Sequence, residues 1–166
     1  MDLYVVRHAI AFERDARRWP DDRDRPLTAE GEKRFRRAAR GMGSIAGEIE
    51  TVLASPLARA WRTAEILAED AGWPAPKPCE ELEPDRPAAE AAGSLRPYRL
   101  AASLAIVGHE PSLSELIAFL ITGSEEGALF ELKKGGCALL ELDGFSPGGA
   151  TLRWLLTPKI ERALPG

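Results

Sequence analysis

The chain holds two histidines, and each follows an apolar, strand-like run. His8 comes directly after residues 3–7, and His109 comes directly after residues 104–108. In open α/β sheets, ligands and catalytic groups collect at the carboxyl ends of the strands. Histidine titrates close to neutral pH and acts as a nucleophile or a base. Two histidines at such strand ends, with Arg7 before the first, indicate chemistry at an anionic group.

Two arginines lie close to predicted strand ends. Arg7 closes a predicted buried strand, where its charge requires an anionic partner, and its planar guanidinium matches phosphate oxygens. Residues 50–54 predict a further strand, and Ser55-Pro56 predicts the start of a helix with Arg59 about one turn in. Helix N-termini bind anions through free N–H groups and the macrodipole. This second segment therefore also favours an anion site.

Each residue has a structural alternative when it is taken alone. Arg7 and His8 fit an ion pair and an ordinary strand-end histidine, Arg59 fits a solvated helix surface, and His109 fits a helix cap near the sheet edge. Together the four residues lie at the carboxyl ends of three predicted parallel strands. The combination favours a single site where the topology gathers them.

The elements that must position these residues follow from hydrophobic periodicity and turn signals. Strands are expected at 2–7, 50–54, 103–108, 128–133, 137–142 and 151–156, and helices from Thr28 to Gly47, from Ser55-Pro56 to Gly72 and from Glu110-Pro111 to Ile121. The last three strands are joined by short glycine-bearing turns, which indicates antiparallel neighbours. The pattern predicts a three-layer α/β/α sandwich on a mixed, mostly parallel sheet with an antiparallel C-terminal part.

Two segments are less regular. Residues 8–26 are densely charged and hold Pro20 and Pro26, so we expect a long loop there. Residues 75–98 are rich in proline and alanine, with a short strand expected at 77–79 and a short helix near 87–94.

Composition excludes several classes of protein. The 166 residues, 45% hydrophobic and 29% charged, are typical of one globular domain spanning 1–166. The net charge of −4 argues against nucleic-acid binding, and the basic run 33–40 fits an exposed helix face. No apolar run approaches the ~20 residues that cross a bilayer. Cys79 and Cys137 lack metal-site spacing and fit a reducing environment, although one disulfide stays open. We expect a cytoplasmic protein without membrane, metal or cofactor.

Three sequence blocks resemble a known family. Arg7-His8-Ala9 is similar to the Arg-His-Gly signature of the histidine phosphatase (phosphoglycerate-mutase-like) superfamily, with Ala9 in place of the glycine. Residues 55–63 match its Ser-Pro-x-x-Arg-Ala-x-x-Thr pattern, and His109 matches its later strand-ending histidine. The small size, the absence of large insertions and the block 25–31 resemble the SixA-type phosphohistidine phosphatases.

The resemblance implies a mechanism that agrees with the chemistry of the residues. His8 would attack phosphorus and form a phosphohistidine intermediate that water hydrolyses. Arg7, Arg25 and Arg59 would bind the non-bridging oxygens, and a protonated His109 would add a hydrogen bond and charge. Such a site needs no metal or other cofactor.

A general acid is harder to assign. Four acidic residues follow the expected strand at 77–79, and Glu81 lies closest to the family's usual location; the four are Glu80, Glu81, Glu83 and Asp85. An acidic loop is more often solvated surface. A phosphoramidate substrate depends less on such an acid, because a ring nitrogen leaves more easily than an alkoxide.

Three functions are therefore open. The first is dephosphorylation of phosphohistidine on a signalling protein, such as a histidine-containing phosphotransfer domain. The second is hydrolysis of a small phosphomonoester or of polyphosphate. The third is a non-catalytic module that binds phosphate or protein. The chain has no large lid insertion to enclose a small molecule, which favours a phosphorylated protein.

Overall fold

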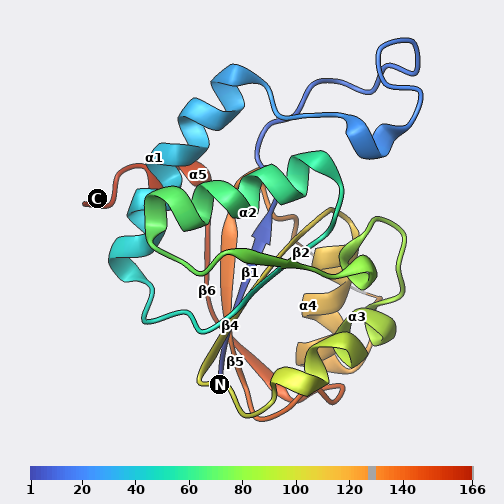
Figure 1. Ribbon diagram of the computed structural model, residues 1–166. Helices are drawn as coiled ribbons and strands as arrows, with labels where there is room; N and C mark the ends of the chain where they lie inside the picture. Colours follow the sequence, from blue (N-terminus) through green and yellow to red (C-terminus); the bar gives the residue numbers. More distant parts are fainter. Residues whose placement is uncertain (127–129, 166) are drawn as a thin grey trace.

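A computed structural model describes residues 1–126 and 130–165. Within them the chain forms a six-stranded sheet with the order β3-β2-β4-β1-β5-β6 (Figure 1). The first four of these strands are parallel, whereas β5 is antiparallel to β1 and β6 is antiparallel to β5. The strands are β1 (Asp2–Arg7), β2 (Val52–Ala54), β3 (Pro76–Pro78), β4 (Ser103–Gly108), β5 (Cys137–Leu142) and β6 (Ala150–Leu156).

Helices cover both faces of the sheet, so the predicted α/β/α sandwich on a mixed sheet is confirmed (Figure 1). Helices α1, α2 and α5 lie on one face, and α3 and α4 lie on the other. The helices are α1 (Ala29–Ile45), α2 (Ala58–Ala71), α3 (Ala88–Leu95), α4 (Ser112–Thr122) and α5 (Pro158–Glu161), with short 3-10 helices η1 (Asp22–Asp24), η2 (Glu80–Leu82) and η3 (Arg96–Tyr98).

The central strand β1 is apolar on both faces because each face meets a helical layer. Leu3 and Val5 belong to the core cluster that α3 and α4 complete, and Tyr4 and Val6 belong to the cluster on the α1 and α2 side. Successive side chains of a strand point to opposite faces, so this alternation fills both cores. The two layers thereby fix β1 at the centre, with Arg7 at its carboxyl end.

The helix starts differ in how well local signals predict them. Thr28 caps α1 as predicted, because its Oγ1 accepts a hydrogen bond from the N–H of Gly31 at 2.9 Å. Helix α1 ends at Ile45, slightly before the expected Gly47. Helix α2 begins at Ala58 rather than at Ser55-Pro56, so that prediction is wrong. Leu57 is the N-cap residue, whereas Ser55 is fully buried, accepts from the N–H of Leu57 at 3.4 Å and lies 2.9 Å from His109 Nε2.

The strand expected at 128–133 is not found where the structure can test it. Residues 128–129 lie outside the described residues, and residues 130–133 form no strand. Side chains take the place of strand partners at Leu132: its N–H donates to Glu110 Oε1 at 3.2 Å, and its carbonyl accepts from Arg7 Nη1 at 2.6 Å. Long-range contacts to the sheet edge therefore override the local β propensity.

The irregular segments behave as the sequence predicts. Residues 8–26 form a long loop that contains only η1 and one isolated bridge between Ala11 and Leu27, and it extends beyond the sheet in Figure 1. The proline-rich segment contains β3 and α3 close to the expected positions. Among the described helices, none has the length and apolar character that crossing a membrane requires.

Candidate active site

The pairing of β1 with β4 brings the two histidines together. The strands are parallel with Arg7 opposite Gly108, so the next residues, His8 and His109, become neighbours. The His8 N–H donates to the Gly108 carbonyl at 3.0 Å. The two imidazole centroids are 5.1 Å apart, and the ring planes are inclined by 54°.

His8 is held in one tautomer by the backbone. Its Nδ1 lies 2.7 Å from the carbonyl oxygen of Ala9. Because a carbonyl only accepts, Nδ1 carries the proton and Nε2 keeps its lone pair. Burial lowers the pKa of His8 to about 3, the charges of Arg59, Arg7 and Arg25 act in the same direction, and the Ala9 hydrogen bond opposes them. His8 is therefore neutral at pH 7, with an unprotonated ring nitrogen.

His109 is also nearly fully buried, and its Nε2 lies 2.9 Å from Ser55 Oγ. Burial lowers the pKa of His109, with smaller contributions from His8, Arg59 and Arg25. The fold by itself thus favours neutral His109. The positive charge expected on this residue requires an anion beside the ring, which would raise its pKa.

Arg25 and Arg59 converge on one carboxylate, Asp22 in η1. Arg25 Nε donates to Asp22 Oδ1 at 2.7 Å, and Arg59 Nη2 lies 3.2 Å from Asp22 Oδ2. The Asp22 backbone carbonyl also accepts from Arg59 Nη1 at 2.9 Å. The hydrogen bond from Arg25 is the largest factor that holds the pKa of Asp22 well below its usual range. Asp22 thus joins the charged loop to the first turn of α2, where Arg59 is 3% exposed.

Arg7 reaches the segment that follows the undescribed residues. Its Nη1 donates to Glu131 Oε1 at 2.7 Å as well as to the carbonyl of Leu132. The structural alternative for Arg7, an ion pair, is therefore present in the molecule. Its Nε, however, is buried without a hydrogen-bond partner among the described residues, and the same holds for Arg59 Nε and His109 Nδ1. Buried polar atoms without hydrogen-bond partners are unfavourable, by roughly 1–3 kcal/mol each.

The structure thus places all five residues singled out from the sequence around one sheet edge. Arg7, Arg25 and Arg59 are all close enough to His8 to act on its pKa, and His109 is in ring contact with it. Topology gathers Arg7, His8, Arg59 and His109 because β1, β2 and β4 are parallel and adjacent, so their carboxyl ends lie together. Arg25 lies in the charged loop and is joined to Arg59 through Asp22.

The sequence assigns no part in the site itself to three further residues, which are Thr63, Ser55 and Asp22. Thr63 Oγ1 accepts from the N–H of Ala9 at 3.0 Å and donates to the Arg59 carbonyl at 2.7 Å, which fixes α2 against the segment after His8. Thr63 and Ser55 both occur in the matched Ser-Pro-x-x-Arg-Ala-x-x-Thr block, so that motif was an available signal. For Asp22 no such signal exists, because the loop holds several similar aspartates.

The acidic residues of segment 80–85 contact different parts of the molecule. Glu81 Oε2 accepts a hydrogen bond from Cys79 Sγ at 3.4 Å, in a pocket that none of the five site residues lines. Glu83 Oε2 instead accepts from Nη1 of Arg23, a residue of η1, at 2.7 Å. The structure therefore brings Glu83, rather than Glu81, to the arginine loop. Cys79 and Cys137 are both buried and free, so no disulfide joins them.

Comparisons with known proteins agree with this geometry. The model of the histidine phosphatase superfamily (branch 1) matches residues 3–83. An uncharacterized protein of Picosynechococcus sp. is 37% identical over 138 residues, which are 82% of either protein. The structure of the protein histidine phosphatase SixA complexed with tungstate is 27% identical and has a TM-score of 0.83, covering 96% of this chain and 99% of that one.

Two other phosphatase structures share the fold. The α-ribazole phosphatase from Shigella flexneri is 21% identical with a TM-score of 0.66, covering 95% of this chain and 97% of its own. Phosphoserine phosphatase from Entamoeba histolytica is 14% identical with a TM-score of 0.70, covering 95% of this chain and 98% of its own. The chain therefore belongs to the histidine phosphatase superfamily (branch 1), as a phosphatase whose fold follows that of SixA over almost its whole length.

Proposed function

We propose that the chain is a single-domain phosphohistidine phosphatase that acts on a signalling protein, such as a histidine-containing phosphotransfer domain. The observation that carries this proposal is His8: it is neutral, has a free Nε2 and lies among three arginines. A ring nitrogen with a lone pair is a competent nucleophile at neutral pH, and the cationic surroundings favour an anionic electrophile.

In this mechanism, His8 Nε2 attacks phosphorus as the bond from phosphorus to the substrate nitrogen breaks, and the substrate imidazole leaves. The phosphoryl group is then bound to His8. In the second step a water oxygen attacks phosphorus, the bond to Nε2 breaks, and inorganic phosphate is released. The Nδ1 hydrogen bond to Ala9 keeps the ring in the reactive orientation in both steps.

The other four residues would stabilise the charge on the transferred group. Arg59 and Arg25, together with Arg7, supply guanidinium donors for the non-bridging oxygens. The buried Nε atoms of Arg7 and Arg59 and the Nδ1 of His109 lack partners among the described residues, which supports a role in binding an acceptor-rich group. The phosphoryl anion would also raise the pKa of His109 and allow it to act as a cation.

The leaving group favours phosphohistidine over an alkyl phosphomonoester. Within residues 1–126 and 130–165, no carboxylate is hydrogen-bonded to His8 or His109, and Glu83 is paired with Arg23. An alkoxide leaving group requires a proton donor. An imidazole leaving group depends less on such a donor. A small phosphomonoester is the second candidate, because proteins named α-ribazole phosphatase and phosphoserine phosphatase share this fold. Polyphosphate belongs to the same alternative.

The test compares initial rates on a phosphohistidine protein, an aryl phosphate, an alkyl phosphate and polyphosphate. We expect the highest kcat/KM on the phosphohistidine protein and no turnover by His8→Ala. Acid-labile phosphate trapped on wild-type His8 would establish the covalent step. Comparable efficiency on alkyl phosphates would refute the proposed substrate, and near-normal turnover by His8→Ala would refute the nucleophile. A protein that turns over none of the four substrates would fit the non-catalytic alternative.

A further inference from the structure

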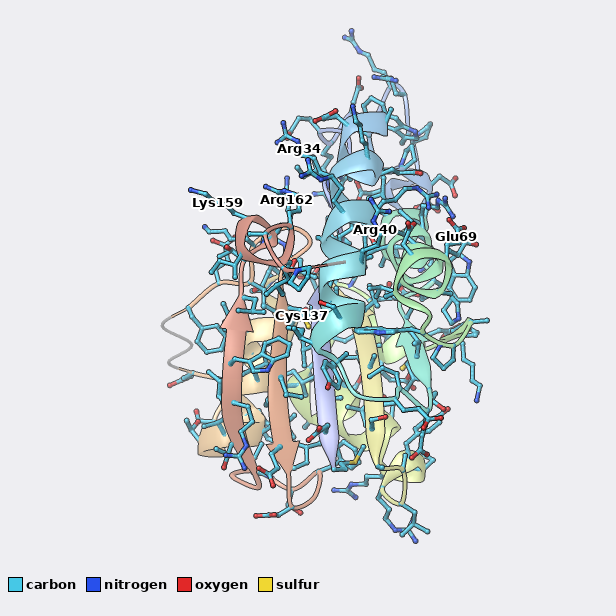
Figure 2. All side chains as sticks on the ribbon, turned by 90° about the vertical axis from the view of Figure 1, so that its left-hand side faces the viewer. Arg34, Arg40, Glu69, Cys137, Lys159 and Arg162 are labelled. Atoms are coloured by element: carbon cyan, nitrogen blue, oxygen red, sulfur yellow. The ribbon has the colours of Figure 1, made fainter. Side chains whose placement is uncertain are left out.

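A cavity lies beside the candidate active site, on the side of α1 and α5. Its volume is about 270 Å³, and it opens between α1, residues 133–135 and α5. Five of its lining residues are cationic, and we call it the basic pocket: Arg34, Lys133, Lys134, Lys159 and Arg162. Figure 2 shows Arg34 on α1 gathered with Lys159 and Arg162 of the α5 region at one end of the molecule.

The basic pocket adjoins the backbone of the nucleophile without using the phosphate-binding arginines. Ala9, which follows His8, lies in its wall. Gly135 also lines it and donates its N–H to the carbonyls of Arg7 and His8, at 3.1 and 3.0 Å. A group bound in this pocket would therefore lie close to the backbone of His8 and contact none of the five site residues.

Two of the cations have exposed carboxylate partners. Arg34 Nε lies 2.7 Å from Glu30 Oε1, and Lys133 Nζ lies 3.6 Å from Glu131 Oε2. All four side chains are more than half exposed, so these pairs are weak and easily exchanged for another anion. They reduce the positive potential of the pocket only in part.

The other three cations have no ion-pair partner within the described part of the chain: Lys134, Lys159 and Arg162. Glu161, the neighbour of Arg162, does not neutralise them, because burial raises its pKa to about 9 and keeps it uncharged at pH 7. The chain as a whole has a net charge of −4. This pocket is thus locally positive, opposite in sign to the net charge of the chain.

The floor of the pocket is apolar. Ile10, Phe35 and Pro158 line it together with backbone of Gly31 and Gly135. A ligand that fits has carboxylates at the rim and an apolar side chain on the floor. An acidic stretch of protein with an apolar residue has both features, whereas polyphosphate has no part that would bury against Phe35.

We infer that the basic pocket binds an acidic segment of the phosphoprotein substrate and thereby positions its phosphohistidine over His8. This inference rests on the proposed function. Complementary charge speeds the encounter of two proteins and selects the partner and its orientation. The pocket would therefore determine which phosphoprotein is dephosphorylated, while His8 and the arginines carry out the chemistry.

The first test measures binding without turnover. A fluorescein-labelled peptide of alternating glutamate and leucine is titrated with wild type and with the triple variant Lys134→Gln/Lys159→Gln/Arg162→Gln. We expect the affinity to fall about tenfold, as the loss of three solvent-accessible charge contacts implies. The control variant Lys77→Gln/Arg96→Gln/Arg99→Gln removes three exposed cations elsewhere and should bind as wild type.

The second test measures kinetics. The triple variant should lower kcat/KM for a phosphohistidine protein about tenfold, mainly through KM, and leave the rate on an aryl phosphate unchanged. Added salt should reduce the difference between wild type and variant. Thermal unfolding of each variant checks the fold, and single Lys159→Glu serves as a second variant if the triple variant is unstable.

Several outcomes would overturn the inference. The first two are an equal loss of kcat/KM on the aryl phosphate and an equal loss of peptide affinity in the control variant. The others are unchanged peptide binding by the triple variant, and displacement of the labelled peptide by tripolyphosphate at a much lower concentration than by unlabelled peptide. The last result would assign the pocket to inorganic polyanions. If wild type hydrolyses the aryl phosphate but not the phosphohistidine protein, the proposed function fails, and the binding test still decides whether the pocket takes an acidic segment.

Discussion

Replacing Glu161 by glutamine should change how the stability of this protein depends on pH. Glu161 is fully buried in α5, where α1 approaches closely at Gly41, and neither carboxylate oxygen has a hydrogen-bond partner among the described residues. Burial raises the pKa of Glu161 from 4.5 to about 9, and the backbone of Cys137 and the charge of Arg162 offset only part of this effect. The folded protein therefore holds Glu161 as a neutral acid across the physiological range.

The sign of the effect follows from linkage between ionisation and folding. In the unfolded chain the Glu161 carboxyl ionises near 4.5, whereas in the folded protein it keeps its proton up to about 9. Its contribution to stability is complete below the unfolded pKa and decreases as pH rises toward the folded pKa, by about 1.4 kcal/mol per unit. Between pH 5 and pH 7 the free energy of unfolding should fall by about 2–3 kcal/mol because of this one group. Glutamine does not ionise, so Glu161→Gln should lack this decrease in the free energy of unfolding.

Urea unfolding followed by tryptophan fluorescence at pH 5 and pH 7 measures the difference. We expect Glu161→Gln to be close to wild type at pH 5 and more stable by about 2–3 kcal/mol at pH 7. Glu48→Gln, at an exposed glutamate, is the matched control and should show no such change. The reasoning would be refuted if the difference in the free energy of unfolding between wild type and Glu161→Gln were the same at both pH values. That result would mean that Glu161 is ionised in the folded protein.

Two further predictions concern catalysis. The lowered pKa of His8, about 3, leaves its ring neutral at pH 5, so kcat/KM for an aryl phosphate should show no loss from protonation of His8 between pH 7 and pH 5. An imidazole NMR signal that titrates near pH 6.5 and is assigned to His8 by its absence from His8→Ala would contradict this. Arg59→Ala should lower kcat on the order of 10²-fold, whereas Arg62→Ala, on the same helix but paired with surface glutamates, should stay within a few-fold of wild type; equal losses in the two variants would remove the special role of Arg59.

Local signals account for much of the fold and for the choice of site residues. The apolar runs before His8 and His109 predict buried strands, since a strand covered on both faces is apolar throughout. Thr28 predicts its helix start because an N-cap depends on a hydrogen bond within one turn. Once the strands are taken as parallel, the carboxyl-end rule places Arg7, His8 and His109 at one edge. These features depend on short stretches of chain and on general topology.

Other predictions failed because long-range contacts decide them. The expected strand at 130–133 is absent where it is described, since Leu132 bonds to Arg7 and Glu110 instead of to a strand. Ser55 was expected to cap α2, but it lies against His109, which is remote in sequence. In both cases the fold brings in a side chain from a distant part of the chain, and the local pattern holds no information about that contact.

The sequence by itself determined the family, the α/β architecture and the residues at the strand ends. Only the tertiary structure decided their chemical state: the neutral His8 with a free Nε2, the Asp22 carboxylate between Arg25 and Arg59, and the basic pocket beside them. The physical reason is that periodicity and motifs depend on neighbours along the chain. Burial, hydrogen-bond partners and local charge depend on every segment that the fold packs against a residue.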